Sequence, residues 1–185
     1  MAHRVCPWWI GYFLASPLRK LRQDPHAILS PYVREGMVVL EPGPGMGFFT
    51  LELARLVGPG GRVIALDVQP KMLSALARRA RRAGLAERIE TRQVADDGMG
   101  LGDLAGAVDF ALAFAMVHEV PDAAHFFAEV AAAMKPGARL LLAEPKGHVD
   151  EPQFAATLEL AGRSGLGAES RPAIPSSHAA VLVRT

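Results

Sequence analysis

The sequence contains very little cysteine and almost no net charge, and each shortage excludes a class of protein. The single cysteine, Cys6, excludes a disulfide within the chain and a metal cage built from several cysteines. The formal net charge is +1, so the composition predicts neither electrostatic steering to nucleic acid nor an acidic substrate. A lone cysteine fits a reducing compartment, and we expect a cytoplasmic protein with no nucleic-acid partner.

Long apolar runs, repeats and linkers are also absent from the sequence. The apolar stretch at residues 5–15 is too short to span a membrane. Its two tryptophans and its proline also make it a poor match to a secretory signal peptide. The chain has 185 residues, 50% of them hydrophobic and 21% charged, as in soluble globular proteins. We therefore expect a single domain over residues 1–185, with a helical lead-in over 1–36 and a core over 37–185.

What the sequence does have is a glycine-rich stretch at residues 38–47, Val-Val-Leu-Glu-Pro-Gly-Pro-Gly-Met-Gly. An apolar run stops at Glu41, three glycines follow at alternate positions, and a helical pattern begins at Phe48. This order predicts a buried strand that turns sharply into a helix, with a loop whose backbone can approach a ligand closely. The dinucleotide-binding fingerprint requires a glycine where Phe48 stands, so a nicotinamide cofactor is disfavoured.

A second apolar run, residues 62–67, ends in Asp67, which lies 20 residues after Gly47. A strand, a helix and a strand within this length form a βαβ unit, which implies a parallel sheet. A carboxylate at the tip of the second strand can accept hydrogen bonds from both hydroxyls of a ribose. The alternative is that Asp67 caps the next helix, which would require only one of its oxygens.

The rest of the chain alternates between helical and strand patterns and ends in a hairpin. We expect helices over residues 70–83, 122–134 and 153–163, and strands over 89–94, 108–115, 140–143, 168–174 and 178–183. Residues 135–137, Lys-Pro-Gly, predict a sharp turn, and Pro172 indicates an edge strand. Four arginines crowd the end of the first of these helices. They form either a nucleic-acid patch or, as the lack of interleaved aromatic residues favours, a solvated face.

Four segments resemble the class I S-adenosylmethionine-dependent methyltransferases, in particular the ubiquinone/menaquinone-biosynthesis and type 11 enzymes. They are Val39-Leu-Glu-Pro-Gly-Pro-Gly-Met-Gly, Ile64-Ala-Leu-Asp67, Ala95-Asp96 and Met134-Lys-Pro-Gly-Ala-Arg-Leu-Leu-Leu. The resemblance covers residues 32–185. It implies an α/β, Rossmann-like seven-stranded sheet of order 3-2-1-4-5-7-6, with only strand 7 antiparallel and helices on both faces. The pattern of the residues supplies the strand number and the final hairpin, and the resemblance supplies the order.

The resemblance also implies S-adenosylmethionine as the cofactor and S-adenosylhomocysteine as its product. Glu41 and the backbone at Gly43 and Gly45 would hold the methionine portion, and Asp67 the ribose hydroxyls. The remaining cofactor contacts would be Val68 with Gln69 at the border of the adenine, Ala95 on its ring, Asp96 at its amino group, and Ala113 and Phe114 at the sulfonium. Pro44 and Asp97 depart from the family's pattern, and Asp97 leaves open which carboxylate meets the adenine.

Transfer of an activated methyl group requires an in-line nucleophile and, where that nucleophile is protonated, a base. His118 follows the fourth strand and is the expected catalytic base or substrate contact. The alternative is that His118 caps the helix that begins near Asp122. Glu119, Glu144 and His148 are further candidates. Together with His118 they match no dedicated ligand spacing, so the sequence predicts no metal site.

The acceptor is the least determined part of the prediction. An Asn/Asp-Pro-Pro-Tyr/Phe element, which many amino-group methyltransferases place after strand four, is absent, and Phe114-Ala-Met-Val-His stands there. We therefore expect a small-molecule or lipid-like acceptor. The aromatic residues Trp8, Trp9, Tyr12 and Phe13 are either core packing or a lid over that acceptor, and a homodimer is the other way to cover it. The alternative functions are a non-catalytic S-adenosylmethionine-binding module and, less favoured, a nicotinamide-dependent oxidoreductase.

Overall fold

The computed structural model describes residues 23–95 and 98–185. The aromatic segment at residues 5–15, the expected lid, lies outside the described residues, as do Asp96 and Asp97. In chain order the elements are α2 (Pro25–Leu29), β1 (Val38–Pro42), α3 (Thr50–Leu56), β2 (Arg62–Asp67), α4 (Pro70–Arg82), η3 (Ala86–Arg88), β3 (Ile89–Gln93), η4 (Gly102–Leu104), β4 (Val108–Phe114), η5 (Val117–Glu119), α5 (Ala123–Ala133), β5 (Met134–Pro145), α6 (Glu151–Arg163), β6 (Leu166–Ser170) and β7 (Ser177–Arg184), where η denotes a short 3-10 helix.

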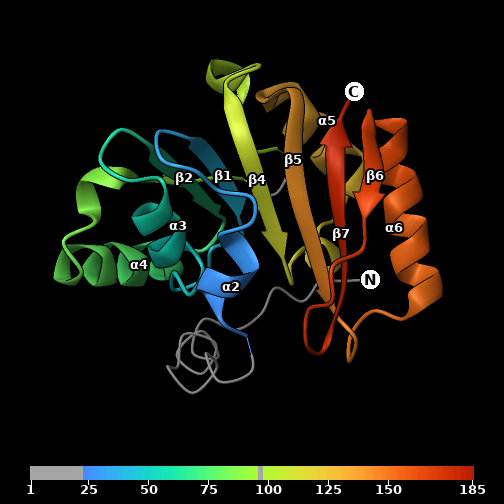
Figure 1. Ribbon diagram of the computed structural model, residues 1–185, viewed down its shortest axis with the longest axis horizontal. Coiled ribbons are helices and arrows are strands. Elements are labelled where there is room, and N and C mark those ends of the chain that lie inside the picture. The colour runs from blue at the N-terminus through green and yellow to red at the C-terminus, as the bar shows by residue number, and fades with distance from the viewer. Residues whose placement is uncertain (1–22, 96–97) are drawn as a thin grey trace. The chain divides into compact units, whose positions relative to one another are not determined.

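The strands form a seven-stranded sheet in the order β3-β2-β1-β4-β5-β7-β6, with helices on both faces (Figure 1). β2 is parallel to β1 and to β3, and β4 is parallel to β5. β7 is antiparallel to both of its neighbours, β5 and β6. The predicted fold class, strand order and single antiparallel strand are therefore confirmed.

The described residues fall into two compact units, the first of which comprises residues 23–95. Its core consists of the apolar strands β1 and β2, and α3 and α4 contact β2. Asp24 caps α2 through the His26 amide, and Pro25 is the first residue of that helix. α3 begins at Thr50 and not at the predicted Phe48, because residues 45–49 form consecutive turns before the helix.

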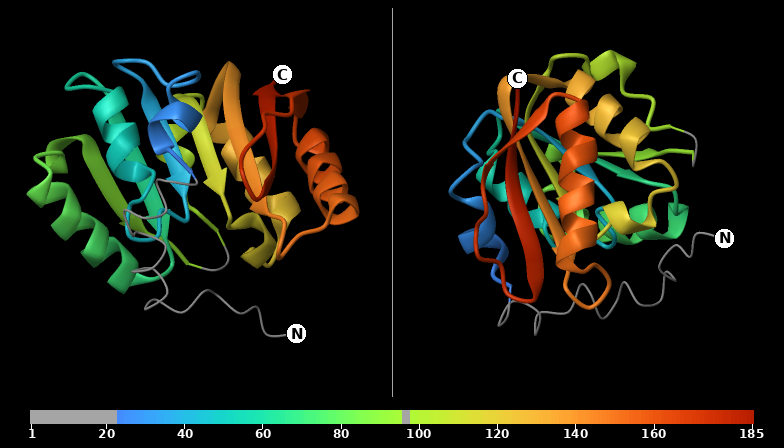
Figure 2. Two further views of the ribbon diagram at one scale, coloured as in Figure 1. Left: turned by 60° about the horizontal axis from the view of Figure 1, so that its bottom comes forward. Right: turned by 90° about the vertical axis from the view of Figure 1, so that its right-hand side faces the viewer.

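The second unit comprises the described residues 98–185. Its core includes three phenylalanines that are almost fully buried, Phe110, Phe127 and Phe154. α5 and α6 pack side by side (Figure 2). Asp150 and Gln153 form a reciprocal capping box that starts α6.

Two predictions within the second unit need correction. Residues 135–137 do not separate α5 from the strand. β5 already begins at Met134, and the Lys-Pro-Gly segment forms an irregularity between the pairs Val108↔Met134 and Phe110↔Arg139. The predicted strand 168–174 is β6, which ends at Ser170 because Pro172 has no amide hydrogen to continue the ladder. β6 is the terminal strand of the sheet, as the proline predicts.

Candidate functional site

The loop after β1 has the backbone geometry that its three glycines permit. Gly43, Gly45 and Gly47 have φ angles of +68°, +54° and +83°, values that residues with a Cβ rarely adopt. The Gly43 amide donates to the Leu66 carbonyl at 2.8 Å, which ties the loop to β2. A Cβ on Gly45 would meet no atom of the described residues within 4 Å, whereas a Cβ on Gly47 would lie 2.4 Å from Leu76 Cδ1 on α4. Gly45 therefore borders open space, and Gly47 permits close packing against α4.

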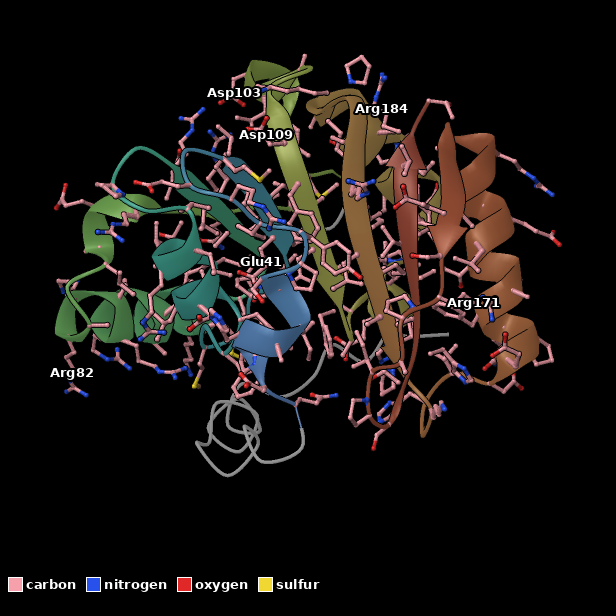
Figure 3. All side chains as sticks on the ribbon, in the orientation of Figure 1. Glu41, Arg82, Asp103, Asp109, Arg171 and Arg184 are labelled. Atoms are coloured by element: carbon pink, nitrogen blue, oxygen red, sulfur yellow. The ribbon has the colours of Figure 1, made fainter. Side chains whose placement is uncertain are left out.

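Glu41 on β1 is a buried carboxylate, and one of its oxygens has no hydrogen-bond partner among residues 23–95 and 98–185. Its residue is 3% exposed, and within the described part of the chain neither Glu41 Oε2 nor the buried Thr50 Oγ1 makes a hydrogen bond of normal geometry. Burial raises the pKa of Glu41 to about 8, and the nearby Thr50 hydroxyl offsets part of this effect. Figure 3 shows Glu41 among the interior side chains. A buried acceptor without a partner is costly, so the arrangement favours a ligand that brings a cation or a hydrogen-bond donor.

Asp67 ends β2 at the same edge of the sheet. Glu41 aligns with Ala65 in the parallel β1–β2 pair, so Asp67 lies two residues beyond that alignment. Asp67 is 8% exposed, and its Oδ1 accepts a hydrogen bond from the Gln69 amide at 2.9 Å. Gln69, and not Asp67, is the N-cap of α4, so the helix-cap interpretation of Asp67 is wrong. One carboxylate oxygen nevertheless holds the turn that follows β2.

The other residues expected around the adenine follow from this turn and from β3. Val68 and Gln69 are half-buried after β2. Asp67 pairs with Gln93 on β3, and the Val94 amide donates to the Asp67 carbonyl at 3.2 Å, which brings exposed Ala95 close to the end of β2. The first unit thus places Glu41, the glycine loop, Asp67, Val68 and Ala95 at the carboxyl ends of its strands, where open α/β sheets bind ligands.

An arginine on α4 supports the glycine loop, a contact that the sequence did not reveal. The Arg79 guanidinium donates to the Met46 carbonyl, and burial lowers the pKa of Arg79. Met46 also packs with Met72 and Ala75 of α4. The interpretation of the arginine cluster as a solvated face is therefore wrong for Arg79. It fits Arg78, Arg81 and Arg82, which are exposed, and Figure 3 shows Arg82 pointing outward.

In the second unit, the end of β4 carries the two residues expected at the sulfonium. Ala113 is fully buried and Phe114 is half-buried. The next residue, Ala115, has a φ of +57°, and its amide donates to the Ala143 carbonyl on β5 at 2.7 Å. Positive φ is uncommon for a residue with a Cβ and is frequent at functional sites. This backbone conformation, which the sequence did not indicate, turns the chain from β4 into η5.

η5 places His118 against Glu144, the residue before the end of β5. His118 Nδ1 contacts Glu144 Oε2, and the Val117 amide donates to Glu144 Oε1 at 2.8 Å. The Glu144 side chain is 1% exposed and that of His118 is 20% exposed. His118 does not cap the following helix, because Asp122 is the N-cap of α5 and accepts from the His125 amide. The helix-cap interpretation of His118 is therefore wrong.

The other two candidates near His118 lie further away. Glu119 Oε1 is 3.8 Å from His118 Nε2, and the ring centroids of His118 and His148 are 5.3 Å apart. The hydrogen bond to Glu144 raises the pKa of His118, burial opposes this, and the charges of Glu144 and Glu119 add to the rise. Within the described residues, no group of three or more histidine, cysteine or acidic side chains could hold a metal ion.

A strand, a glycine loop, a helix and a second strand ending in an acid describe many nucleotide-binding proteins, so the family has to be decided by sequence comparison. The profile of the family described as "Methyltransferase domain" matches residues 39–137, more than half of the chain. The chain belongs to the S-adenosylmethionine-dependent methyltransferases of class I. The matched stretch includes Glu41, the glycine loop, Asp67 and His118.

Curated relatives agree with this family, and a solved structure shares the fold. The ubiquinone/menaquinone biosynthesis C-methyltransferase of Pasteurella multocida is 30% identical over 112 residues, 60% of this chain and 41% of that protein. The catechol O-methyltransferase of Mycobacterium tuberculosis is 48% identical over 52 residues, 28% of this chain and 24% of that protein. The chain thus aligns with less than half of the length of these curated relatives. A methyltransferase structure from Aquifex aeolicus, at 23% identity, has a TM-score of 0.87 over 98% of this chain and all of its own.

S-adenosylmethionine is the cofactor of this methyltransferase family, and the residues present fit it. Glu41 Oε2, which no described residue pairs with, is an acceptor for a cationic group such as an ammonium, and no described residue fills the space beside Gly45. The Asp67 carboxylate ends the neighbouring strand β2, and its Oδ1 accepts a hydrogen bond from the Gln69 amide. No helix in the described parts of the chain is both long enough and apolar enough to cross a membrane.

Proposed function

We propose that this methyltransferase transfers a methyl group from S-adenosylmethionine to a small-molecule or lipid-like acceptor. The observation that carries the proposal is Glu41, a buried carboxylate with one oxygen unpaired among the described residues, beside a loop of three glycines with positive φ. Such a carboxylate is stabilised when a cationic group pairs with it. Bound S-adenosylmethionine supplies a methyl group that is already activated by its sulfonium.

The chain's own residues have distinct tasks in this proposal. Glu41, with the backbone at Gly43 and Gly45, binds the amino-acid end of the cofactor. Asp67 binds the ribose, while Val68, Gln69 and Ala95 border the adenine. Ala113 and Phe114 at the end of β4 surround the sulfonium, and Asp96, outside the described residues, is the proposed partner of the adenine amino group.

His118 is the proposed catalytic base. His118 follows β4 in the chain, at the carboxyl end of that strand, and its side chain is partly exposed. The names of two relatives, a quinone-biosynthesis C-methyltransferase and a catechol O-methyltransferase, support a small aromatic acceptor for this chain as well. The sequence after β4 lacks the Asn/Asp-Pro-Pro-Tyr/Phe element, and this absence argues against an amino-group acceptor.

Calorimetric titration tests the cofactor part of the proposal. We expect the full chain to bind S-adenosylhomocysteine and not NAD, because Phe48 replaces the third glycine of the dinucleotide fingerprint. Tight NAD binding without S-adenosylhomocysteine binding contradicts the proposal. Binding of the cofactor without turnover of any acceptor would support the alternative, a non-catalytic cofactor-binding module.

A further inference from the structure

The Glu144 carboxylate is buried near the end of β5, a position that an apolar side chain could fill without the cost of burying a charge. Its residue is 1% exposed, and transfer of a carboxylate from water into a protein interior is costly unless specific groups compensate. Two contacts do so. Oε1 accepts from the Val117 amide at 2.8 Å, and Oε2 meets His118 Nδ1. Both partners belong to η5, so Glu144 fixes the position of that short helix and of the histidine that it carries.

The contact also determines which nitrogen of His118 can accept a proton. A carboxylate only accepts hydrogen bonds, so the nitrogen that faces it, Nδ1, carries the hydrogen. In the neutral ring the lone pair then lies on Nε2, which is therefore the proton acceptor. Among the described residues, the ionisable groups around the ring are Glu144 from β5, Glu119 from η5 with its Oε1 at 3.8 Å from Nε2, and His148 with its ring centroid at 5.3 Å from that of His118.

We propose that Glu144 is a positioning residue that holds His118 as a general base, and that the acceptor is a phenol-type hydroxyl. The proposal rests on the proposed function and names its acceptor class. In the step, the acceptor O–H bond breaks and its proton joins His118 Nε2. The acceptor oxygen bonds to the methyl carbon of S-adenosylmethionine. The bond between that carbon and sulfur breaks, and its electron pair remains on sulfur.

A general base at His118 indicates the chemical class of the acceptor, because only some acceptors must lose a proton during methyl transfer. A phenol has a pKa near 10 and is mostly neutral at pH 7, so its nucleophilicity depends on removal of its proton as the methyl group is transferred. A neutral amine attacks through a lone pair and loses its proton only afterwards, so the transfer itself needs no base. A partly exposed imidazole, aligned by a buried carboxylate, thus matches a hydroxyl acceptor better than an amine acceptor.

The first experiment measures the orientation and the pKa of His118 without any acceptor. The probe is the full chain with ¹⁵N-labelled histidine, titrated by NMR, with the His118 resonances assigned from His118→Gln. We expect a pKa above the ordinary 6.5, because the contact with Glu144 favours the charged ring. At high pH the neutral ring should carry its proton on Nδ1. Glu144→Gln, which keeps the shape of the side chain, should lower this pKa.

The chain offers a matched control for that substitution. Glu151 Oε2 lies 2.8 Å from His178 Nδ1, a second histidine–glutamate pair in the same unit, but at an exposed glutamate. Glu151→Gln should leave the titration of His118 unchanged. A His118 pKa that is the same in wild type and Glu144→Gln, or a neutral ring protonated on Nε2, would overturn the positioning role.

The second experiment measures turnover with phenol probes, catechol and hydroquinone, against an amine probe, aniline. We expect methylation of a phenol, with kcat/KM rising with pH through the His118 pKa and levelling above it. Glu144→Gln should move this rise to lower pH, and His118→Gln should lower the plateau about 100-fold or more, since general bases contribute about 10²–10⁴-fold. His118 is partly exposed, so His118→Gln keeps the test decisive if Glu144→Gln does not fold.

The outcomes separate this inference from the proposed function. Failure of the wild-type chain to bind S-adenosylhomocysteine contradicts the proposed function itself. If S-adenosylhomocysteine binds but aniline is methylated and neither phenol is, the hydroxyl assignment is wrong. If the high-pH plateau of kcat/KM is the same in His118→Gln as in wild type, His118 is not the general base.

Discussion

At the scale of the residue, Glu41 dominates the candidate cofactor site. Its carboxyl group combines almost complete burial, an oxygen with no partner in the described part of the chain and a pKa raised to about 8. Near neutral pH the folded protein without ligand therefore holds Glu41 protonated, whereas the unfolded chain ionises it near 4.5. The same group thus links protein stability and ligand binding to pH.

The stability of the ligand-free protein should fall as the pH rises from about 4.5 to about 8. In this window the folded state binds a proton that the unfolded state has released, so the Glu41 contribution falls by about 1.4 kcal/mol per pH unit. Below the window both states are protonated, and above it both are ionised. Glu41→Gln should remove this part of the pH dependence and unfold at a higher temperature than wild type at pH 8. Equal slopes for the two proteins in thermal melts across the window would contradict the expected pKa.

Glu41→Gln should also lower the affinity of the protein for its cofactor. Pairing with a cationic group requires the ionised carboxylate, so binding of S-adenosylhomocysteine at pH 7 should release a proton from Glu41. Calorimetry in buffers of different ionisation enthalpy measures this release directly, and affinity should increase with pH up to about 8. Binding without proton release would place the ligand's cationic group elsewhere.

Asp67 permits a sharper test, because its Oδ1 also accepts a hydrogen bond that holds the turn after β2. Asp67→Ala should lower the affinity for S-adenosylhomocysteine about ten- to a hundredfold, since charge-assisted hydrogen bonds contribute roughly 1.5–3 kcal/mol. Asp67→Asn is the control, because its amide oxygen can still accept from the Gln69 amide and preserve the turn. Loss of affinity in both variants with an unchanged melting temperature supports a ligand role. Unchanged affinity in Asp67→Ala would reduce Asp67 to a structural residue of the turn.

At the scale of the element, the loop between β1 and α3 has one side packed and one side open. Gly47 packs against Leu76 of α4, and the Arg79 guanidinium holds the Met46 carbonyl. At Gly45, in contrast, there is open space within 4 Å of an added Cβ. One part of the loop therefore fixes the structure and the other faces the proposed ligand.

Two alanine substitutions should separate these parts of the loop. Both positions have positive φ, so each alanine should cost about 1 kcal/mol in backbone strain. Gly47→Ala should destabilise by about 1–3 kcal/mol more, because its Cβ overlaps the buried Leu76 side chain. Gly45→Ala should instead reduce S-adenosylhomocysteine affinity, because its Cβ enters the open space. Denaturant unfolding and calorimetry on both variants would show this, and equal destabilisation by the two would contradict it.

At the scale of the whole molecule, the single-domain prediction is the one to test. The described residues divide into two compact units, while their strands belong to one sheet order. A shared sheet favours cooperative unfolding, so we expect one calorimetric transition for the full chain. S-adenosylhomocysteine at 100 times its dissociation constant should stabilise the protein by about 2.7 kcal/mol and raise the whole transition by several degrees. Two transitions, of which only one responds to the ligand, would show independent domains.

The sequence predicted most of the fold because the strands β1, β2 and β4 are largely apolar runs bounded by turn residues. The β1–α3–β2 unit is local, and the glycines and the acids at the strand ends are visible without a structure. The errors occur where a neighbour in space decides the outcome. The Lys-Pro-Gly segment predicted a turn, but β4 pairs with Met134 before that segment and with Arg139 after it. Arg79 belonged to a charged cluster in sequence, but a carbonyl 33 residues away binds it.

The sequence by itself determined the kind of site, because glycine spacing and strand-end acids are local features that set what the backbone can do. Only the tertiary structure decided the state of each group. Burial raises the pKa of Glu41, and the Ala115 turn brings His118 against a carboxylate 26 residues further along the chain. Solvation and hydrogen bonding depend on which distant segments surround a side chain, and its immediate sequence neighbours do not contain that information.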